Sequence, residues 1–169
     1  MNYSGIKYTD MINGEGIRVS LFVSGCSHFC KECFNSDTWD KNYGDPFTLE
    51  VENKILDYFR KYNRNIRGLS LLGGDPTFKE NIPVLVNFVK RFKNEFPDKD
   101  IWIWSGYTWE EITASQELFS LVSLCHVLID GKFKIEQKNL TLKWRGSENQ
   151  RVINIQKSIN SNSTVKYID

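Results

Sequence analysis

Residues 21–35 read LFVSGCSHFCKECFN and place three of the chain's four cysteines directly after an apolar run that predicts a strand. Cys26, Cys30 and Cys33 are spaced C-x3-C-x2-C, so one compact loop can bring three thiolates to the same metal ion or cluster. Thiolates are soft ligands that suit zinc, copper(I) and iron–sulfur clusters. A closed zinc site or an ordinary ferredoxin cluster uses four ligands, whereas three thiolates leave one iron of a cluster open.

Two other interpretations of these cysteines stay open on the residues alone. A zinc site would recruit His28 as its fourth ligand, but His28 lies between Cys26 and Cys30, where simultaneous chelation is awkward. Three unrelated buried cysteines are the second alternative, and the polar neighbours Lys31 and Glu32 argue against it because they make the loop unlike a core.

Length and composition predict one soluble globular domain. The chain has 169 residues, 40% apolar and 25% charged, with a formal charge of +1, so nothing in the overall charge favours nucleic acid or a membrane surface as a partner. The first thirty residues contain no signal-peptide h-region, and no later apolar run has the length of a spanning helix. We therefore expect the cytoplasm, where thiols stay reduced, and we expect the isolated Cys125 to be a small buried hydrophobe.

Apolar periodicity predicts alternating strands and helices. Buried strands are expected over residues 17–24, 69–72, 101–104, 124–129 and 152–155, and helices from Thr48 through Tyr62, over 82–96 and from 109 through about 122. This alternation predicts an α/β fold with a mainly parallel sheet.

Polar, glycine-bearing segments follow the predicted strands. They are the cysteine loop, Gly73-Gly74-Asp75, Ser105-Gly106 and Asp130-Gly131. In parallel α/β folds the ligand sits at the carboxyl ends of the strands. We therefore expect these four segments to meet at one edge of the sheet.

The cysteine motif, followed directly by Phe34, resembles the signature of the radical S-adenosylmethionine superfamily. The resemblance implies a 4Fe-4S cluster on Cys26, Cys30 and Cys33, whose fourth iron chelates S-adenosylmethionine. Reductive cleavage of that cofactor would give methionine and a 5'-deoxyadenosyl radical. The segment 73–76, Gly-Gly-Asp-Pro, resembles the superfamily's glycine-rich motif that lines the methionine moiety, although many members carry Glu in place of Asp75.

More narrowly, the chain resembles the activating components of anaerobic (class III) ribonucleoside-triphosphate reductases. The similar segments are 13–18, 20–26, 33–35 with 38–39, 72–76, 104–107, 130–131 and 145–151. The family's usual Asp-Gly-Pro-Gly appears here as Asn-Gly-Glu-Gly over 13–16. The resemblance implies a radical S-adenosylmethionine domain over residues 1–155, folded as a partial, open TIM-like barrel, and we expect a loosely ordered tail over 156–169.

The implied activity places a glycyl radical on the large reductase subunit, with an electron donor such as flavodoxin. No catalytic residue is implied beyond the cluster and S-adenosylmethionine. The implied cofactor contacts are Glu32, Cys33 and Phe34 at the adenine, Gly73, Gly74 and Asp75 at the methionine, and Ser105 at ribose or methionine. Asp130 and Asn149 are further cofactor-binding candidates, with no part of the cofactor assigned to them. Trp102, Trp104, Trp109 and Trp144 are predicted to be packing residues.

Two alternative functions are weighed against this one. An activase of another glycyl-radical enzyme, such as a formate-lyase-like partner, is disfavoured by the segment 145–151 and by the lack of an inserted ferredoxin-like cysteine group. A non-catalytic zinc or iron–sulfur module is the other alternative, and it gives the segment 73–75 no role.

Overall fold

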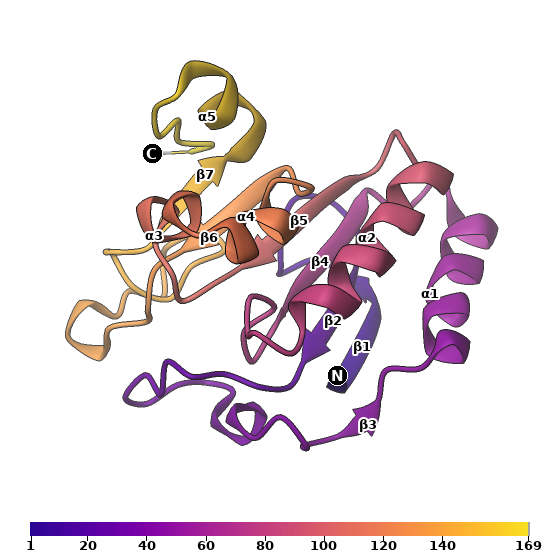
Figure 1. The fold of residues 1–169 in the computed structure, drawn as a ribbon, viewed down its shortest axis with the longest axis horizontal. Helices are drawn as coiled ribbons and strands as arrows, with labels where there is room; N and C mark the ends of the chain where they lie inside the picture. Colours follow the sequence, from indigo (N-terminus) through magenta and orange to yellow (C-terminus); the bar gives the residue numbers. More distant parts are fainter. Residues whose placement is uncertain (169) are drawn as a thin grey trace.

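The computed structural model describes residues 1–168 and contains one seven-stranded sheet (Figure 1). The strands are β1 (Asn2–Asp10), β2 (Arg18–Val23), β3 (Asp45–Pro46), β4 (Gly68–Gly73), β5 (Asp100–Trp104), β6 (Val127–Asp130) and β7 (Arg151–Asn154). The helices are α1 (Leu49–Tyr62), α2 (Ile82–Glu95), α3 (Trp109–Ala114), α4 (Gln116–Val122) and α5 (Ile155–Ser161), with 3-10 turns η1 (Ser36–Trp39) and η2 (Ile135–Gln137). No helix in this part of the chain is both long and apolar enough to cross a bilayer.

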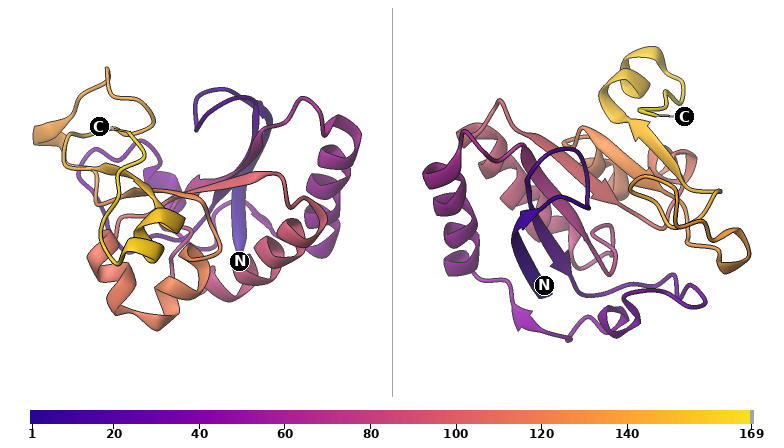
Figure 2. Two further views of the ribbon diagram at one scale, coloured as in Figure 1. Left: turned by 90° about the horizontal axis from the view of Figure 1, so that it is seen from above. Right: turned by 180° about the vertical axis from the view of Figure 1, so that it is seen from behind.

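The sheet has a parallel centre and antiparallel edges. Its order is β3-β1-β2-β4-β5-β6-β7, in which the neighbours from β2 to β6 pair in parallel. β1 pairs antiparallel with β2, and β7 antiparallel with β6. Helices α1 to α4 lie on one side of the sheet, which remains open rather than closing on itself (Figure 2). The predicted α/β fold, a partial barrel with mainly parallel strands, is confirmed.

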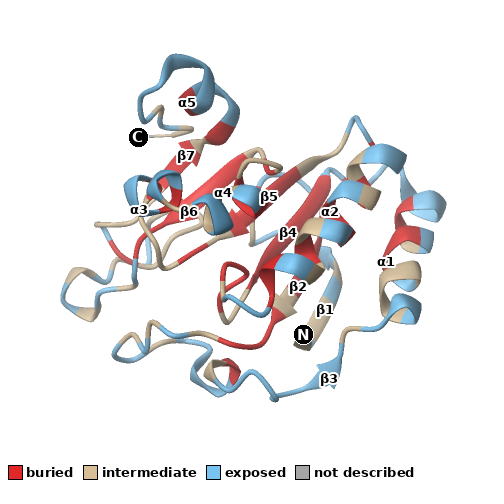
Figure 3. Ribbon diagram, in the orientation of Figure 1, coloured by how far each residue is buried: buried red, intermediate tan, exposed pale blue. Residues whose placement is uncertain are grey.

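The central strands are buried on both faces, as a parallel sheet requires (Figure 3). On the helical side, Leu21, Leu71 and Ile103 join one large core with the apolar faces of α1 and α2. On the other side, Trp102 and Ile129 belong to a smaller cluster that the partly buried Trp104, Trp144 and Tyr167 cover. The strand around Trp102 therefore separates two apolar layers, which explains why its sequence lacks polar alternation.

Three local features differ from the sequence prediction. β1 was not predicted. The single helix expected from 109 to about 122 is two helices, because Ser115 leaves helical backbone angles and its side chain caps α4 by accepting from the Leu118 N–H. The strand expected from residue 124 starts only at Val127, since Leu124 and Cys125 are held in a turn by hydrogen bonds to the end of α4.

Most of the tail has defined structure, in contrast to the loosely ordered segment expected over 156–169. Residues 155–161 form α5, and the segment after it returns along β7, where Tyr167 N–H donates to the Val152 carbonyl at 2.7 Å. The Tyr167 ring contacts Trp102, and its hydroxyl donates to Glu15 at 2.9 Å. Asp169 lies outside the described residues.

A buried arginine ties the amino ends of the central strands together. Arg18 is fully buried, and its guanidinium lies 2.6 Å from an Asp100 carboxylate oxygen. It also donates to Ser70 Oγ at 2.7 Å and to the Leu69 carbonyl at 2.8 Å. Arg67 pairs with the other oxygen of Asp100 at 2.9 Å, but its side chain is 58% exposed.

We expect the two arginines to differ strongly in their effect on stability. Arg18→Ala leaves the half-buried Asp100 carboxylate with only its exposed partner and removes the fully buried guanidinium from Ser70 and the Leu69 carbonyl. It should lower the free energy of unfolding by about 3–5 kcal/mol. Arg67→Ala removes an exposed partner of the same carboxylate and should cost less than about 1 kcal/mol. Urea denaturation of both variants measures the difference, and equal losses would contradict this assignment.

Candidate functional site

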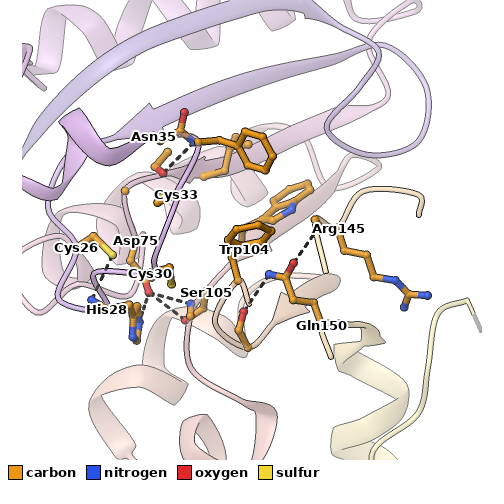
Figure 4. Close-up of a pocket in the computed structure, with 18 of the residues that line it drawn as sticks. Cys26, His28, Cys30, Cys33, Asn35, Asp75, Trp104, Ser105, Arg145 and Gln150 are labelled. Atoms are coloured by element: carbon orange, nitrogen blue, oxygen red, sulfur yellow. Dashed lines mark hydrogen bonds and ion pairs between the residues drawn. The ribbon is translucent and has the colours of Figure 1, made fainter. Parts of the chain in front are cut away.

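A cavity of about 190 Å³ lies where the carboxyl ends of β2, β4, β5 and β6 meet (Figure 4). The cysteine loop, the turn after β4, the turn after β5 and the segment after β6 all contribute to it, which confirms the expected convergence of the four polar segments. Its lining residues are Cys26, His28, Cys30, Cys33, Phe34, Asn35, Leu72, Gly73, Gly74, Asp75, Trp104, Ser105, Gly106, Gly131, Phe133, Trp144, Arg145, Gly146 and Gln150.

The cysteine loop is closed at its base by backbone hydrogen bonds. Gly25 N–H donates to the Thr38 carbonyl at 2.8 Å, and Cys26 N–H donates to the Trp39 carbonyl at 3.2 Å. Within the loop, Phe29 and Glu32 have positive φ angles of 49° and 56°. Non-glycine residues rarely adopt this conformation, and such strain concentrates at functional sites where the surrounding structure maintains it.

The cavity-facing thiols are partly shielded from water. Burial raises the pKa of Cys26 to about 11 and also raises that of Cys30. Backbone N–H groups oppose this effect, because the Cys26 sulfur accepts from His28 N–H at 3.5 Å and Cys30 faces the Phe133 N–H. Both cysteines are therefore thiols at neutral pH in the metal-free chain, and binding a metal must displace their protons.

The donor set fits an iron–sulfur cluster better than a single ion. Over residues 1–168, no three His, Cys, Asp or Glu side chains are arranged to hold one metal ion. A cluster does not need its thiolates to converge on one point, because each thiolate binds a different iron. His28, the fourth ligand of the zinc alternative, is held 2.7 Å from Asp75 through its Nε2 atom. The three cysteines of one cavity thus suit a cluster with an open iron.

Asp75 connects three of the segments around the cavity. The residue is 2% exposed, and its carboxylate makes five hydrogen-bond contacts with four residues. Thr77 donates twice to one oxygen, from its N–H at 2.7 Å and its hydroxyl at 2.5 Å. The other oxygen contacts His28 Nε2 at 2.7 Å, Gly106 N–H at 3.0 Å and Ser105 Oγ at 3.4 Å. The predicted methionine contact of Asp75 stays a prediction, and the carboxylate's role in this structure is to fasten the cysteine loop to the strand ends.

The glycines at this edge permit close contacts within the protein. Gly73 has a positive φ of 113°, and a Cβ on Gly74 would lie 2.6 Å from the Gly25 carbonyl oxygen. A Cβ on Gly106 would overlap the His28 ring. Gly73 and Gly74 line the cavity, and their contact with the methionine moiety stays a prediction. Tight packing on the start of the cysteine loop already explains why position 74 lacks a side chain.

Three further predicted cofactor contacts, Phe34, Ser105 and Glu32, differ in whether they line the cavity. Phe34 and Ser105 line the cavity. Phe34 is 65% exposed, and its ring lies 5.5 Å from that of Phe133, whereas Ser105 is buried and hydrogen-bonds Thr77 at 2.7 Å. Glu32 is exposed and is absent from the lining. It lies in the turn that is closed by the hydrogen bond from Cys33 N–H to the Cys30 carbonyl at 3.1 Å.

The structure does not bring Asp130 and Asn149 into the cavity. The Asp130 carboxylate accepts from Trp109 N–H at 2.8 Å and pairs with Arg151 at 2.5 Å, so it holds α3 and β7 to the end of β6. Arg151 also binds Glu110, and this hydrogen bond lowers the pKa of Glu110 to about 2. Asn149 donates to the Lys132 carbonyl at 2.8 Å and closes the loop before β7.

Trp104, Trp144, Arg145 and Gln150 are among the lining residues to which the sequence assigns no cofactor role. Trp104 and Trp144, predicted as packing residues, do pack, and they also form a wall of the cavity, joined by a 2.9 Å hydrogen bond from Trp104 Nε1 to the Trp144 carbonyl. Arg145 and Gln150 also line it, and Gln150 donates to the Gly131 carbonyl at 2.9 Å. The resemblance over 145–151 was the available signal, but it assigned no contact to these side chains.

We expect the cysteines to separate into cluster ligands and a structural thiol. After anaerobic reconstitution, Cys26→Ala, Cys30→Ala and Cys33→Ala should each lose the roughly four irons per chain of one 4Fe-4S cluster. Cys125, fully buried in the core, provides the matched control, and Cys125→Ala should retain the iron. Iron and sulfide analysis measures this, and retention of iron by Cys33→Ala would count against the three-ligand site.

We further expect Gly106→Ala to disturb the cysteine loop through His28. The new methyl group forces the His28 ring away from Asp75, so overpacking should cost about 1–3 kcal/mol and speed iron loss from the reconstituted protein. Gly5→Ala is the control, because a Cβ at Gly5 would meet nothing within 4 Å. Thermal unfolding and the rate of iron release to a chelator measure both effects. Identical behaviour of the two variants would exclude the proposed contact.

Comparison with known proteins assigns the family. A family model described as a 4Fe-4S single cluster domain matches residues 12–153. The anaerobic ribonucleoside-triphosphate reductase-activating protein of Pasteurella multocida is 45% identical over 150 residues, which cover 89% of this chain and 95% of the relative. The proteins of the same name from Vibrio cholerae and Enterobacteria phage T4 are 47% and 42% identical, over 89% and 90% of this chain and 96% and 93% of theirs. The chain therefore belongs to the family of anaerobic ribonucleoside-triphosphate reductase-activating proteins, which contains a 4Fe-4S single cluster domain.

Proposed function

We propose that this chain activates an anaerobic ribonucleoside-triphosphate reductase by radical S-adenosylmethionine chemistry, with residues 1–155 as the radical domain. The observation that carries the proposal is a cavity lined by three cysteines, in which the neighbouring His28 is engaged with Asp75 at 2.7 Å. Among residues 1–168, no three donor side chains are arranged around a single ion. When bound, a reduced 4Fe-4S cluster supplies the electron that cleaves S-adenosylmethionine to methionine and a 5'-deoxyadenosyl radical. This chemistry would serve to generate a radical on a backbone glycine of the large reductase subunit.

The residues of the chain hold and orient the two cofactors. Cys26, Cys30 and Cys33 would hold the cluster and leave one iron facing the cavity. The turn at Gly73 and Gly74 offers backbone groups to the methionine part, because it lines the same cavity. Hydrogen bonds around Asp75 fix the distance between the cysteine loop and this turn, so both cofactors would be held by one rigid assembly rather than by a mobile loop.

Apolar walls suit a site that must protect a reactive species. Leu72, Trp104, Phe133 and Trp144 line the cavity beside the cysteine loop. These side chains offer few polar groups and exclude water from the reacting atoms, which prevents side reactions. Phe34 stands at the mouth, where its ring can pack against the adenine.

The partners follow from the family and from the electron requirement. The relatives' name states that they activate anaerobic ribonucleoside-triphosphate reductase, and we assign this chain the large subunit of such an enzyme as its protein substrate. The reaction needs one external electron per cleavage, which we assign to a small donor protein such as flavodoxin. We place the protein in the cytoplasm, where the cysteines stay reduced until they bind iron.

Anaerobic assays separate this function from its alternatives. The reconstituted protein with dithionite and S-adenosylmethionine should release 5'-deoxyadenosine, and addition of the large reductase subunit should yield a glycyl radical by electron paramagnetic resonance. Cys33→Ala should abolish both signals.

One bound zinc with no cleavage would instead identify a non-catalytic module. Cleavage with a radical formed only on a formate-lyase-like partner would reassign the substrate.

A further inference from the structure

The segment between β6 and β7 carries an unusual concentration of positive charge. Over residues 131–146, which we call the basic arm, there are five basic residues and one acidic residue, a net charge of +4. The whole chain has a formal charge of +1, so the remaining residues are acidic on balance. The basic arm extends away from the sheet beside the cysteine loop (Figure 1).

The lysines of the basic arm are not neutralised within the protein. Lys132, Lys134, Lys138 and Lys143 are exposed, and none of them forms an ion pair with another residue in 1–168. Cations elsewhere on the surface often do, as in the contact of Lys54 with Glu50 at 2.9 Å. A local excess of unpaired charge attracts an oppositely charged partner and raises the rate of encounter.

Exposed apolar side chains accompany this charge. Leu140 on the basic arm is 75% exposed, and Phe34 of the cysteine loop is 65% exposed. Phe34 packs against Phe133 of the basic arm, and the Lys138 ammonium lies 5.2 Å from the Phe34 ring centre. Apolar and aromatic contacts within a polar, charged rim are the usual anatomy of a protein–protein interface.

The basic arm also forms part of the cavity itself. Phe133, Trp144 and Gly146 line it together with the cysteines, and the Phe133 backbone faces Cys30. A polypeptide that places a glycine in the cavity therefore comes next to the basic arm. An electron donor has no such need, because electrons reach a cluster without entry of the donor into the cavity.

We propose that the basic arm, together with Phe34, is the docking surface for an acidic segment of the large reductase subunit that adjoins the glycine to be activated. This inference rests on the proposed function and adds the recognition chemistry to it. Carboxylates of the target would meet Lys134, Lys138 and Lys143, and apolar target side chains would cover Phe34 and Leu140. The lysines act on recognition and not on cleavage of S-adenosylmethionine.

The test neutralises charge on the basic arm of the reconstituted full-length protein. Lys134→Gln combined with Lys143→Gln should weaken binding to the large subunit about fivefold and flatten its dependence on salt, because two exposed ionic contacts are lost. Substituting Glu at both positions should weaken binding further. The matched control is Lys61→Gln with Lys90→Gln, two exposed lysines on α1 and α2 that should leave the affinity unchanged.

Release of 5'-deoxyadenosine in the absence of the large subunit should be the same in all variants. Binding of the large subunit and cleavage of S-adenosylmethionine are therefore measured separately. Unchanged affinity in the double variant, or an equal loss in the control, would overturn the proposal. Slower reduction by flavodoxin with normal large-subunit affinity would overturn it in favour of an electron-donor site. If even the unaltered protein fails to cleave S-adenosylmethionine, the proposed function fails, while the affinity measurement still decides whether the basic arm binds the subunit.

Discussion

The buried carboxylate of Asp75 joins segments that are far apart in the sequence. Through His28 it holds the cysteine loop, through Thr77 its own turn after β4, and through Ser105 and Gly106 the turn after β5. A buried carboxylate is costly unless it is fully hydrogen-bonded, and any donor that loses it becomes unsatisfied as well. The mutual position of the thiols and the glycine turn therefore depends on this one residue.

The two faces of the sheet have different tasks. On one face, helices α1 to α4 cover a continuous apolar core, which gives the strands a rigid support. On the other, a smaller aromatic cluster around Trp102 leads through Trp144 to the cavity. The sheet stays open on this second side (Figure 2), where we propose that the basic arm receives the glycine-bearing segment of the reductase. The stable core and the reactive site thus share strands without sharing side chains.

Much of the fold and the centre of the site could be predicted from local patterns. Buried apolar runs predicted β4 and β5, and helical periodicity predicted α1 and α2. The spacing of Cys26, Cys30 and Cys33 predicted that these three thiols meet at one site, and the structure brings them to one cavity. Features that depend on tertiary contacts were not accessible. Ser115 divides a helix because its side chain caps the next one, and Tyr167 orders the tail by contacting Trp102 and Glu15 from across the chain. The sequence predicts Asp75 and Asn149 as ligand contacts. In the structure both form hydrogen bonds with groups of the protein itself, and the spacing of residues in the sequence does not reveal these partners.

The central claim is that three thiolates hold a cluster with one chemically distinct iron. Mössbauer spectroscopy of protein reconstituted with 57Fe tests it directly, because each iron site contributes its own signal. Our account predicts that adding S-adenosylmethionine changes the spectrum of one iron in four and leaves the other three as they were. Four irons that all remain equivalent after the addition, or the absence of any four-iron cluster, would contradict it.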